Sequence, residues 1–391
     1  MDQTTADRTE PRITKSLRRT MNAPLGLTRR HALATLAATL GGGWATPIFA
    51  QTPATPKPNL PATPKPSFPK PTLHVYPDYG WLRGFNYIMP WGARIEDTWW
   101  FYDGTKMRED MALARSVHAN AIRLWIDYSV WYRDPEKVTA SFLDAIAAID
   151  ENGMRAMPCI FNRWVGGRHD YGGTHTENIR PNMPEQLAYV RALVTPLAAD
   201  PRVFCWDLCN EPQGGADPTF KTVSEELSLR EYRWLMGIAD TVKRCGARQP
   251  VTIGTMNGTN ITFYAPLVDV LCAHPYARDR AGLEQLITGY RAMVAEEKKP
   301  MLVNECVPGS DKDEVRGETH RYYWEKLSAA GLGCMPWSLR EGRHVAARRD
   351  RMDGNGIDNK GYHPTFNADG TLRAGHEWMR EKPTLRAPWE K

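Results

Sequence analysis

The 391 residues carry a formal net charge of +5, but the first fifty hold seven Lys/Arg against three Asp/Glu and so account for +4 of it. The remaining +1 gives no sign of a nucleic-acid partner. Without these fifty residues and the proline-rich stretch that follows, about 320 residues remain, which is enough for one large domain.

Residues 1–50 have the pattern of an export signal. Thr28-Arg29-Arg30-His31-Ala32-Leu33 precedes a mildly apolar run ending at Ile48-Phe49-Ala50, as in a twin-arginine signal peptide with a small residue at the cut. A chance basic N-terminus before a membrane helix is the alternative, but three glycines and a proline interrupt the run, which is weakly hydrophobic. We predict cleavage, a periplasmic or secreted bacterial protein and no transmembrane span afterwards. Met21 is an alternative start.

Residues 51–72 form a proline-rich linker with an internal repeat. Pro53 to Leu60 reads Pro-Ala-Thr-Pro-Lys-Pro-Asn-Leu, and Pro61 to Phe68 repeats it with Ser and Phe at the end. This composition favours extended polyproline II, so we predict a semi-rigid tether, with a ligand for a proline-binding module as the alternative. The cysteines show no metal-type spacing, and we interpret them as small buried thiols.

Residues 73–391 alternate short apolar runs with helical patterns, which predicts a single (β/α)₈ barrel with its active site at the carboxyl ends of the strands. A doubly wound open sheet is the alternative, but no glycine-rich phosphate loop follows the first run. The predicted strands are 81–87, 121–126, 154–161, 203–208, 251–255, 268–273, 300–304 and 333–337. The predicted helices are 107–118, 140–151, 184–197, 229–244, 283–296 and 318–330.

Polar and aromatic residues stand at the ends of the first three runs. The first contains Asn86, and the second contains Arg123, whose buried guanidinium needs a carboxylate partner, either at the site or in a structural ion pair elsewhere in the barrel. The third ends in Asn162-Arg163-Trp164. The loop after the first run carries rings that either stack on sugars or pack under the loop, namely Trp91, Trp99, Trp100 and Tyr102.

Two later runs end on glutamates. Val203 to Leu208 leads to Asn210-Glu211-Pro212, where the proline ends the strand and holds the carboxylate at its tip, and Pro300 to Asn304 leads to Glu305. Two carboxylates at the tips of core strands are the minimum for glycosidic bond cleavage. The sixth run ends His274-Pro275-Tyr276, and the eighth ends at Trp337.

These strand ends resemble the retaining glycoside hydrolases of clan A, especially family 5, between about Trp81 and Trp378. The resemblance implies that Glu211 is the acid/base, Glu305 the nucleophile and Trp337 the platform under the cleaved sugar. It further implies that Arg123 and Tyr276 support Glu305, that His274 contacts substrate or acid/base, and that Asn210 binds the hydroxyl next to the anomeric carbon. Family 5 has a histidine near the end of strand 3, where this chain has Asn162; His169 and His175 are candidates to replace it.

The sequence therefore predicts a retaining β-glycosidase that needs no metal or organic cofactor. The same residues would also serve a transglycosylase, and a non-catalytic glycan-binding barrel at the cell envelope is the alternative from another class. The loop after Trp337 carries Arg340 and Arg343, which either form surface salt bridges or bind an anionic or heavily hydroxylated glycan. The sugar, the linkage and the oligomeric state leave no signal in the sequence.

Overall fold

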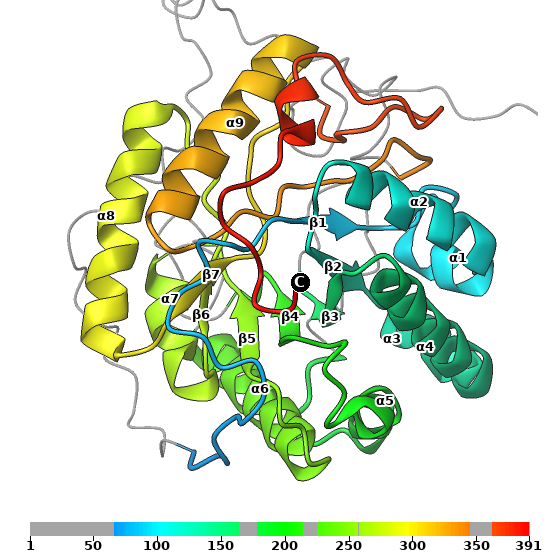
Figure 1. Cartoon of the computed structure of the whole chain (residues 1–391). Helices are drawn as coiled ribbons and strands as arrows, with labels where there is room; N and C mark the ends of the chain where they lie inside the picture. The colour runs from blue at the N-terminus through cyan, green and yellow to red at the C-terminus, as the bar shows by residue number, and fades with distance from the viewer. Residues whose placement is uncertain (1–65, 164–177, 214–224, 257, 345–361, 391) are drawn as a thin grey trace, which may run out of the picture. The chain divides into compact units, whose positions relative to one another are not determined.

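The protein is built from parallel β-strands that alternate with α-helices, as the sequence predicts. The computed structural model describes residues 66–163, 178–213, 225–256, 258–344 and 362–390. The strands in this part of the chain are β1 (Gly84–Tyr87), β2 (Ala121–Trp125), β3 (Arg155–Asn162), β4 (Trp206–Asn210), β5 (Val251–Gly254), β6 (Leu271–Ala273) and β7 (Met301–Val303). In Figure 1 they lie at the centre, with the longer helices around them.

All six predicted helices are confirmed, with ends shifted by a few residues, and three short helices were not predicted. The α-helices of the described residues are α1 (Ile95–Trp100), α2 (Gly104–Ser116), α3 (Tyr128–Arg133), α4 (Pro135–Glu151), α5 (Pro184–Val194), α6 (Glu225–Arg244), α7 (Gly258–Tyr264), α8 (Arg280–Glu297) and α9 (Asp313–Ala329). Short 3₁₀ turns are η2 (Thr195–Leu197), η3 (Ala265–Leu267) and η6 (Glu377–Arg380). None of the described helices combines the length and the apolar character that a membrane crossing requires.

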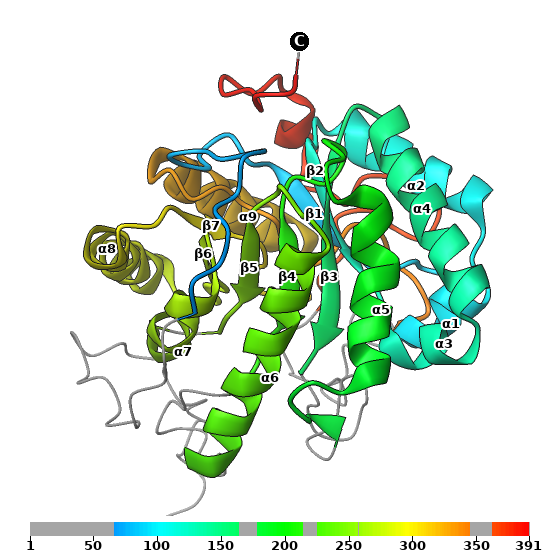
Figure 2. The same cartoon turned by 90° about the horizontal axis from the view of Figure 1, so that it is seen from below.

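The strands form two parallel sheets, β1-β2-β3-β4-β5 and β6-β7. Figure 2 shows the strands of the larger sheet beside one another, with α5 and α6 packed outside them. Between β5 and β6 threonine hydroxyls carry part of the connection: Thr252 Oγ1 donates to the Val270 carbonyl at 2.8 Å, and Thr255 Oγ1 donates to the Cys272 carbonyl at 2.5 Å. The backbone N–H of His274 donates to the Thr255 carbonyl at 2.9 Å.

The predicted eighth strand, residues 333–337, is not a continuous strand. Isolated parallel bridges join Cys334 to Arg83 before β1 and Pro336 to Cys306 after β7. Gly333 has a positive φ of 71°, and Pro336 has no N–H to donate, so neither residue fits a regular ladder. The segment nevertheless lies between β1 and β7, because Asn86 N–H donates to Pro336 and Trp337 N–H donates to Cys306.

Helix α4 illustrates how local sequence sets the outer layer. Asp134 caps its N-terminus by accepting from the Lys137 N–H, and Pro135 begins the helix with a φ that is already helical. One face then carries the buried residues Val138, Phe142, Ala145, Ile146 and Ile149 at helical spacing. Burying a side chain of this size contributes roughly 1.5–3 kcal/mol, so this face fixes the helix against the sheet.

Candidate active site

The tips of β4 and β7 bring the two predicted catalytic glutamates together. One carboxylate oxygen of Glu211, one of Glu305 and a ring nitrogen of His274 all lie within 4.8 Å of one another. Glu211 has a positive φ of 46°, which is uncommon for a residue other than glycine, and its N–H donates to the Gly254 carbonyl at 2.7 Å. This backbone turn at the end of β4 directs the Glu211 side chain toward Glu305.

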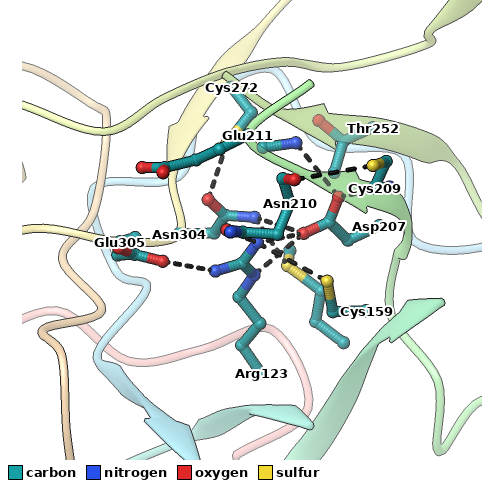
Figure 3. Close-up of polar contacts among 12 residues, drawn as sticks. Arg123, Cys159, Asp207, Cys209, Asn210, Glu211, Thr252, Cys272, Asn304 and Glu305 are labelled. Carbon is teal, nitrogen blue, oxygen red and sulfur yellow. Dashed lines mark hydrogen bonds and ion pairs between the residues drawn. The ribbon is translucent and has the colours of Figure 1, made fainter. Parts of the chain in front are cut away.

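Arg123 in β2 contacts two buried carboxylates, and Figure 3 shows its guanidinium between Glu305 and Asp207. Nη1 donates to Glu305 Oε2 at 2.8 Å, and Nε donates to Asp207 Oδ2 at 2.8 Å. Burial by itself would lower the pKa of Arg123, but the charges of Asp207 and Glu305 outweigh it, so the pKa is raised. Arg123 is fully buried and remains charged because two carboxylates surround it.

Asp207 and Asn304 join this cation to the other glutamate. Asn304 Nδ2 donates to Asp207 Oδ2 at 3.0 Å, and Asn304 Oδ1 lies 2.8 Å from His274 Nε2. His274 Nδ1 in turn lies 2.9 Å from Glu211 Oε1. A continuous series of hydrogen bonds therefore links the two glutamates, and we call its members the polar ring: Arg123, Asp207, Glu211, His274, Asn304 and Glu305.

The neighbours of His274 in the polar ring raise its pKa. Burial tends to lower the pKa of its imidazole, but the charge of Glu305, the hydrogen bonds to its ring and the charge of Glu211 raise the pKa to about 10. Tyr276 Oη donates to Glu305 Oε1 at 3.0 Å, and burial together with both glutamates raises the pKa of this phenol well above its usual value. Tyr276 therefore remains a hydrogen-bond donor to Glu305 at neutral pH.

The structure brings most of the other predicted residues to the same place. Asn86 Oδ1 accepts from Arg123 Nη1 at 2.8 Å and from Trp125 Nε1 at 3.1 Å. Asn210 Oδ1 accepts from Arg123 Nη2 at 2.9 Å, and Asn210 Nδ2 donates to Asn162 Oδ1 at 3.0 Å. Asn162 therefore lies beside the polar ring and orients the Asn210 side chain.

Trp337 packs edge-on against Trp125, with ring centroids 5.1 Å apart. The Arg316 guanidinium donates to the Trp337 carbonyl at 2.9 Å, which anchors this residue from α9. Trp337 is thus held next to the polar ring by contacts on both its side chain and its backbone. Trp164, His169 and His175 lie outside the described residues.

Arg340 lies apart from the polar ring. Its Nη1 forms an ion pair with Asp110 Oδ1 at 2.6 Å, and Nη2 donates to the Ala368 carbonyl. It lines a cleft of about 1000 Å³. The described residues around this cleft are Pro90, Trp91, Ala93, Lys106, Glu109, Asp110, Arg340, Glu341, Gly342, Arg343 and Ala368.

Glu211, His274 and Glu305 together offer three ligand atoms that a metal ion would need. The donor set fits a metal poorly because Arg123 already forms an ion pair with Glu305. All seven cysteines are free, and six of them are buried.

Two members of the polar ring, Asp207 and Asn304, were not predicted from the sequence, although a signal was present for Asp207. Asp207 stands inside an apolar run, as Arg123 does, and two opposite charges inside two core strands predict a buried pair. Asn304 gave no signal, since an amide before a strand-end glutamate has no distinctive pattern. Gly254 also matters: a Cβ there would lie 2.8 Å from Arg123 Nη2 and from His274 Nε2, so only glycine leaves room for both.

Comparisons with known proteins agree with this fold. No protein-family model and no curated protein sequence matches the chain. Among solved structures, the chain is similar to the exo-beta-1,4-mannosidase Op5Man5 from Opitutaceae bacterium strain TAV5, with a TM-score of 0.59, 16% identity and coverage of 76% of this chain and 57% of that chain. This chain thus spans little more than half of that protein.

Two further structures are similar over most of their own length. The endo-1,4-beta-D-mannanase from Thermotoga petrophila RKU-1 gives a TM-score of 0.54 with 17% identity, covering 76% of this chain and 98% of that one. GH5_18 from Streptomyces cattleya, in complex with GlcNAc, gives 0.56 with 16% identity, covering 82% and 83%. At these identities the likeness concerns the fold alone, an arrangement of parallel strands and helices that this chain shares with these glycosidases.

Proposed function

We propose that the protein is a retaining β-glycoside hydrolase that cleaves a β-linked glycan or oligosaccharide on a (β/α)₈ barrel. The observation that carries the proposal is the closeness of the two glutamates, since one carboxylate oxygen of Glu211 lies within 4.8 Å of one of Glu305. Retaining enzymes hold their carboxyl groups about 5 Å apart, whereas inverting enzymes leave roughly 6.5–9.5 Å for a water molecule. The fold shared with known glycosidases supports the same reaction class.

In the proposed reaction Glu305 attacks the anomeric carbon, while Glu211 in its protonated form donates to the leaving oxygen. Arg123 and Tyr276 each donate a hydrogen bond to one oxygen of Glu305, which holds the nucleophile in place. Glu211 then removes a proton from water, and that water releases the sugar from Glu305 with its original configuration. Asn210 binds the hydroxyl next to the anomeric carbon, and Trp337 supports the sugar ring.

The cleft beside Arg340 provides space for the rest of a glycan chain. Its lining includes Pro90 and Trp91, which follow β1, and Arg340 and Arg343, which follow Trp337; the Arg343 N–H donates to the Pro90 carbonyl at 2.8 Å. Replacing the exposed Arg343 by Ala tests whether its charge binds an anionic glycan. A rise in KM for a glycan with carboxylate groups, and none for its neutral counterpart, is the expected result; equal KM values on both would remove this role.

The proposal also covers the two segments that precede the barrel, residues 1–50 and 51–72. We propose that residues 1–50 are a twin-arginine signal, that 51–72 tether the barrel, and that the barrel works outside the cytoplasm. Mass spectrometry of the protein recovered from the periplasm or medium tests this, and a chain that still carries residues 1–50 there would contradict it.

The decisive experiment is hydrolysis of aryl β-glycosides and of β-linked glucans, mannans and galactans, with Glu305→Ala as the control. We expect activity with retention of configuration in the first product, and a loss of at least about four orders of magnitude in the variant. A first product of inverted configuration would contradict the double displacement. Activity that survives in Glu305→Ala would exclude Glu305 as the nucleophile.

A further inference from the structure

Asp207 is a buried carboxylate that contacts Arg123, which pairs with Glu305, and Asn304, which leads to His274 and Glu211. Its exposed fraction is 0%. Oδ2 accepts from Arg123 Nε and Asn304 Nδ2, and Oδ1 accepts from the backbone N–H of Gly254 at 3.0 Å and of Cys209 at 3.3 Å. These contacts come from β2, β4, β5 and the end of β7, so Asp207 is the point at which four chain segments meet.

The charge of Asp207 decides how the amide of Asn304 is turned. An ionised carboxylate only accepts hydrogen bonds, so the NH₂ group of Asn304 must face Asp207. The amide oxygen is then directed to the other side, where it lies 2.8 Å from His274 Nε2 and accepts from Cys272 Sγ. The reversed amide would place its NH₂ group against two donors and its oxygen against a carboxylate.

The orientation of Asn304 in turn decides which proton of His274 is fixed. Because an amide oxygen only accepts, His274 Nε2 must carry a hydrogen. Nδ1, at 2.9 Å from Glu211 Oε1, is left as the nitrogen whose proton can move. One proton can then lie either on Glu211, with Nδ1 as its acceptor, or on Nδ1, with Glu211 as its acceptor.

We propose that Asp207 is a positioning residue that, through Asn304, keeps the Nε2 proton of His274 in place, so that Glu211 and Nδ1 share the proton used in catalysis. The same carboxylate holds Arg123 against Glu305, so it orients both the acid/base and the nucleophile. The part that concerns catalysis rests on the proposed glycosidase function. During cleavage the shared proton passes from Glu211 to the leaving oxygen, and water returns one proton to Glu211.

Nitrogen-15 NMR of the histidine rings tests the proposal independently of any activity. In the whole protein at pH 7, His274→Gln identifies the His274 signals, and we expect a protonated Nε2. In Asp207→Asn an amide replaces the carboxylate, so the Asn304 NH₂ group is no longer required on that side and the Asn304 amide can turn. We then expect His274 Nε2 to lose its proton while Nδ1 keeps one. An unchanged Nε2–H signal in a folded Asp207→Asn protein would overturn the proposal.

Kinetics with two leaving groups then separate positioning from a general structural role. Proton donation matters for phenyl β-glycosides, because phenol is a poor leaving group. It matters little for 2,4-dinitrophenyl β-glycosides, because 2,4-dinitrophenol is a good one. We expect Asp207→Asn to lower kcat/KM about 100-fold for the phenyl β-glycosides. For the 2,4-dinitrophenyl β-glycosides we expect a loss of no more than about tenfold. Equal losses for the two substrates would mean that Asp207 does not act through the acid/base.

Asp269→Asn is the matched control for the loss of an ion pair beside a strand. Asp269 pairs with Lys243 at 2.6 Å and accepts from the Val251 N–H at 2.9 Å, at the beginning of β5 and away from the polar ring. We expect it to leave both the His274 signals and the leaving-group ratio unchanged. A wild-type protein without glycosidase activity would overturn the proposed function, whereas the NMR comparison would still decide the role of Asp207.

Discussion

Two buried histidines in this protein respond to their surroundings in opposite ways. His274 in the polar ring is 3% exposed, and its pKa is raised to about 10. His376, just before η6, is 0% exposed, and burial together with Arg316 lowers its pKa to about 3. His320 in α9 packs edge-on against His376, and burial with the charge of Arg316 places its pKa well below the usual value.

The difference lies in the charge of the neighbours and not in the degree of burial. Carboxylates of Glu211 and Glu305 lie 2.9 and 3.9 Å from His274 Nδ1. The second region, which we call the histidine–arginine cluster, consists of His320, His376, Arg83, Arg316 and Arg373. Burial opposes charge at both sites, and only the negative neighbours of His274 overcome it.

The strongest test of this comparison removes the cation that balances the polar ring. Arg123→Met keeps most of the side-chain volume but leaves Asp207 and Glu305 buried without their partner. We expect the free energy of unfolding at pH 7 to fall by about 3–5 kcal/mol, measured by urea denaturation. The exposed pair of Arg244 and Asp240 is the control, and Arg244→Met should lose less than about 0.5 kcal/mol. Similar losses in both variants would show that the stability of the polar ring does not depend on Arg123.

A smaller effect is expected from the raised pKa of His274. A histidine whose folded-state pKa of about 10 exceeds its ordinary value of 6.5 stabilises the protein below pH 6.5, and this contribution is lost as the pH rises toward 10. Between pH 7 and 9 the wild type should lose about 2–3 kcal/mol that His274→Gln does not lose. Parallel stability curves for the two proteins over this range would argue that His274 is neutral.

The histidine–arginine cluster should show the reverse sign on the acid side. With a folded-state pKa of about 3, His376 stays neutral while the unfolded chain takes up its proton below pH 6.5, so stability falls as the pH is lowered. From pH 7 to pH 5 the wild type should lose about 2 kcal/mol more than His376→Phe. Thermal or urea unfolding at both values measures the difference, and an equal loss in the variant would show that the ring is protonated when folded.

Much of the fold and part of the candidate site were predictable because they follow local pattern. Apolar runs of strand length alternate with amphipathic helices, which predicts parallel strands surrounded by helices. Since the carboxyl ends of parallel strands meet at one face, two glutamates at such ends had to lie near each other. The segment 333–337 differs from its predicted strand because the positive φ of Gly333 and the missing N–H of Pro336 interrupt the ladder.

The sequence by itself determined the order of helices and strands and the residue types at the strand ends, since these depend on propensity and spacing within a few residues. Only the tertiary structure decided that Asp207 and Asn304 connect Arg123 to His274, because those partners lie 30 to 97 positions apart along the chain. It also decided the direction in which the pKa of each buried histidine shifts. A histidine in an apolar sequence looks the same whether the chain folds carboxylates or arginines around it, and the sign of its pKa shift depends on which of these charges lies within a few ångströms.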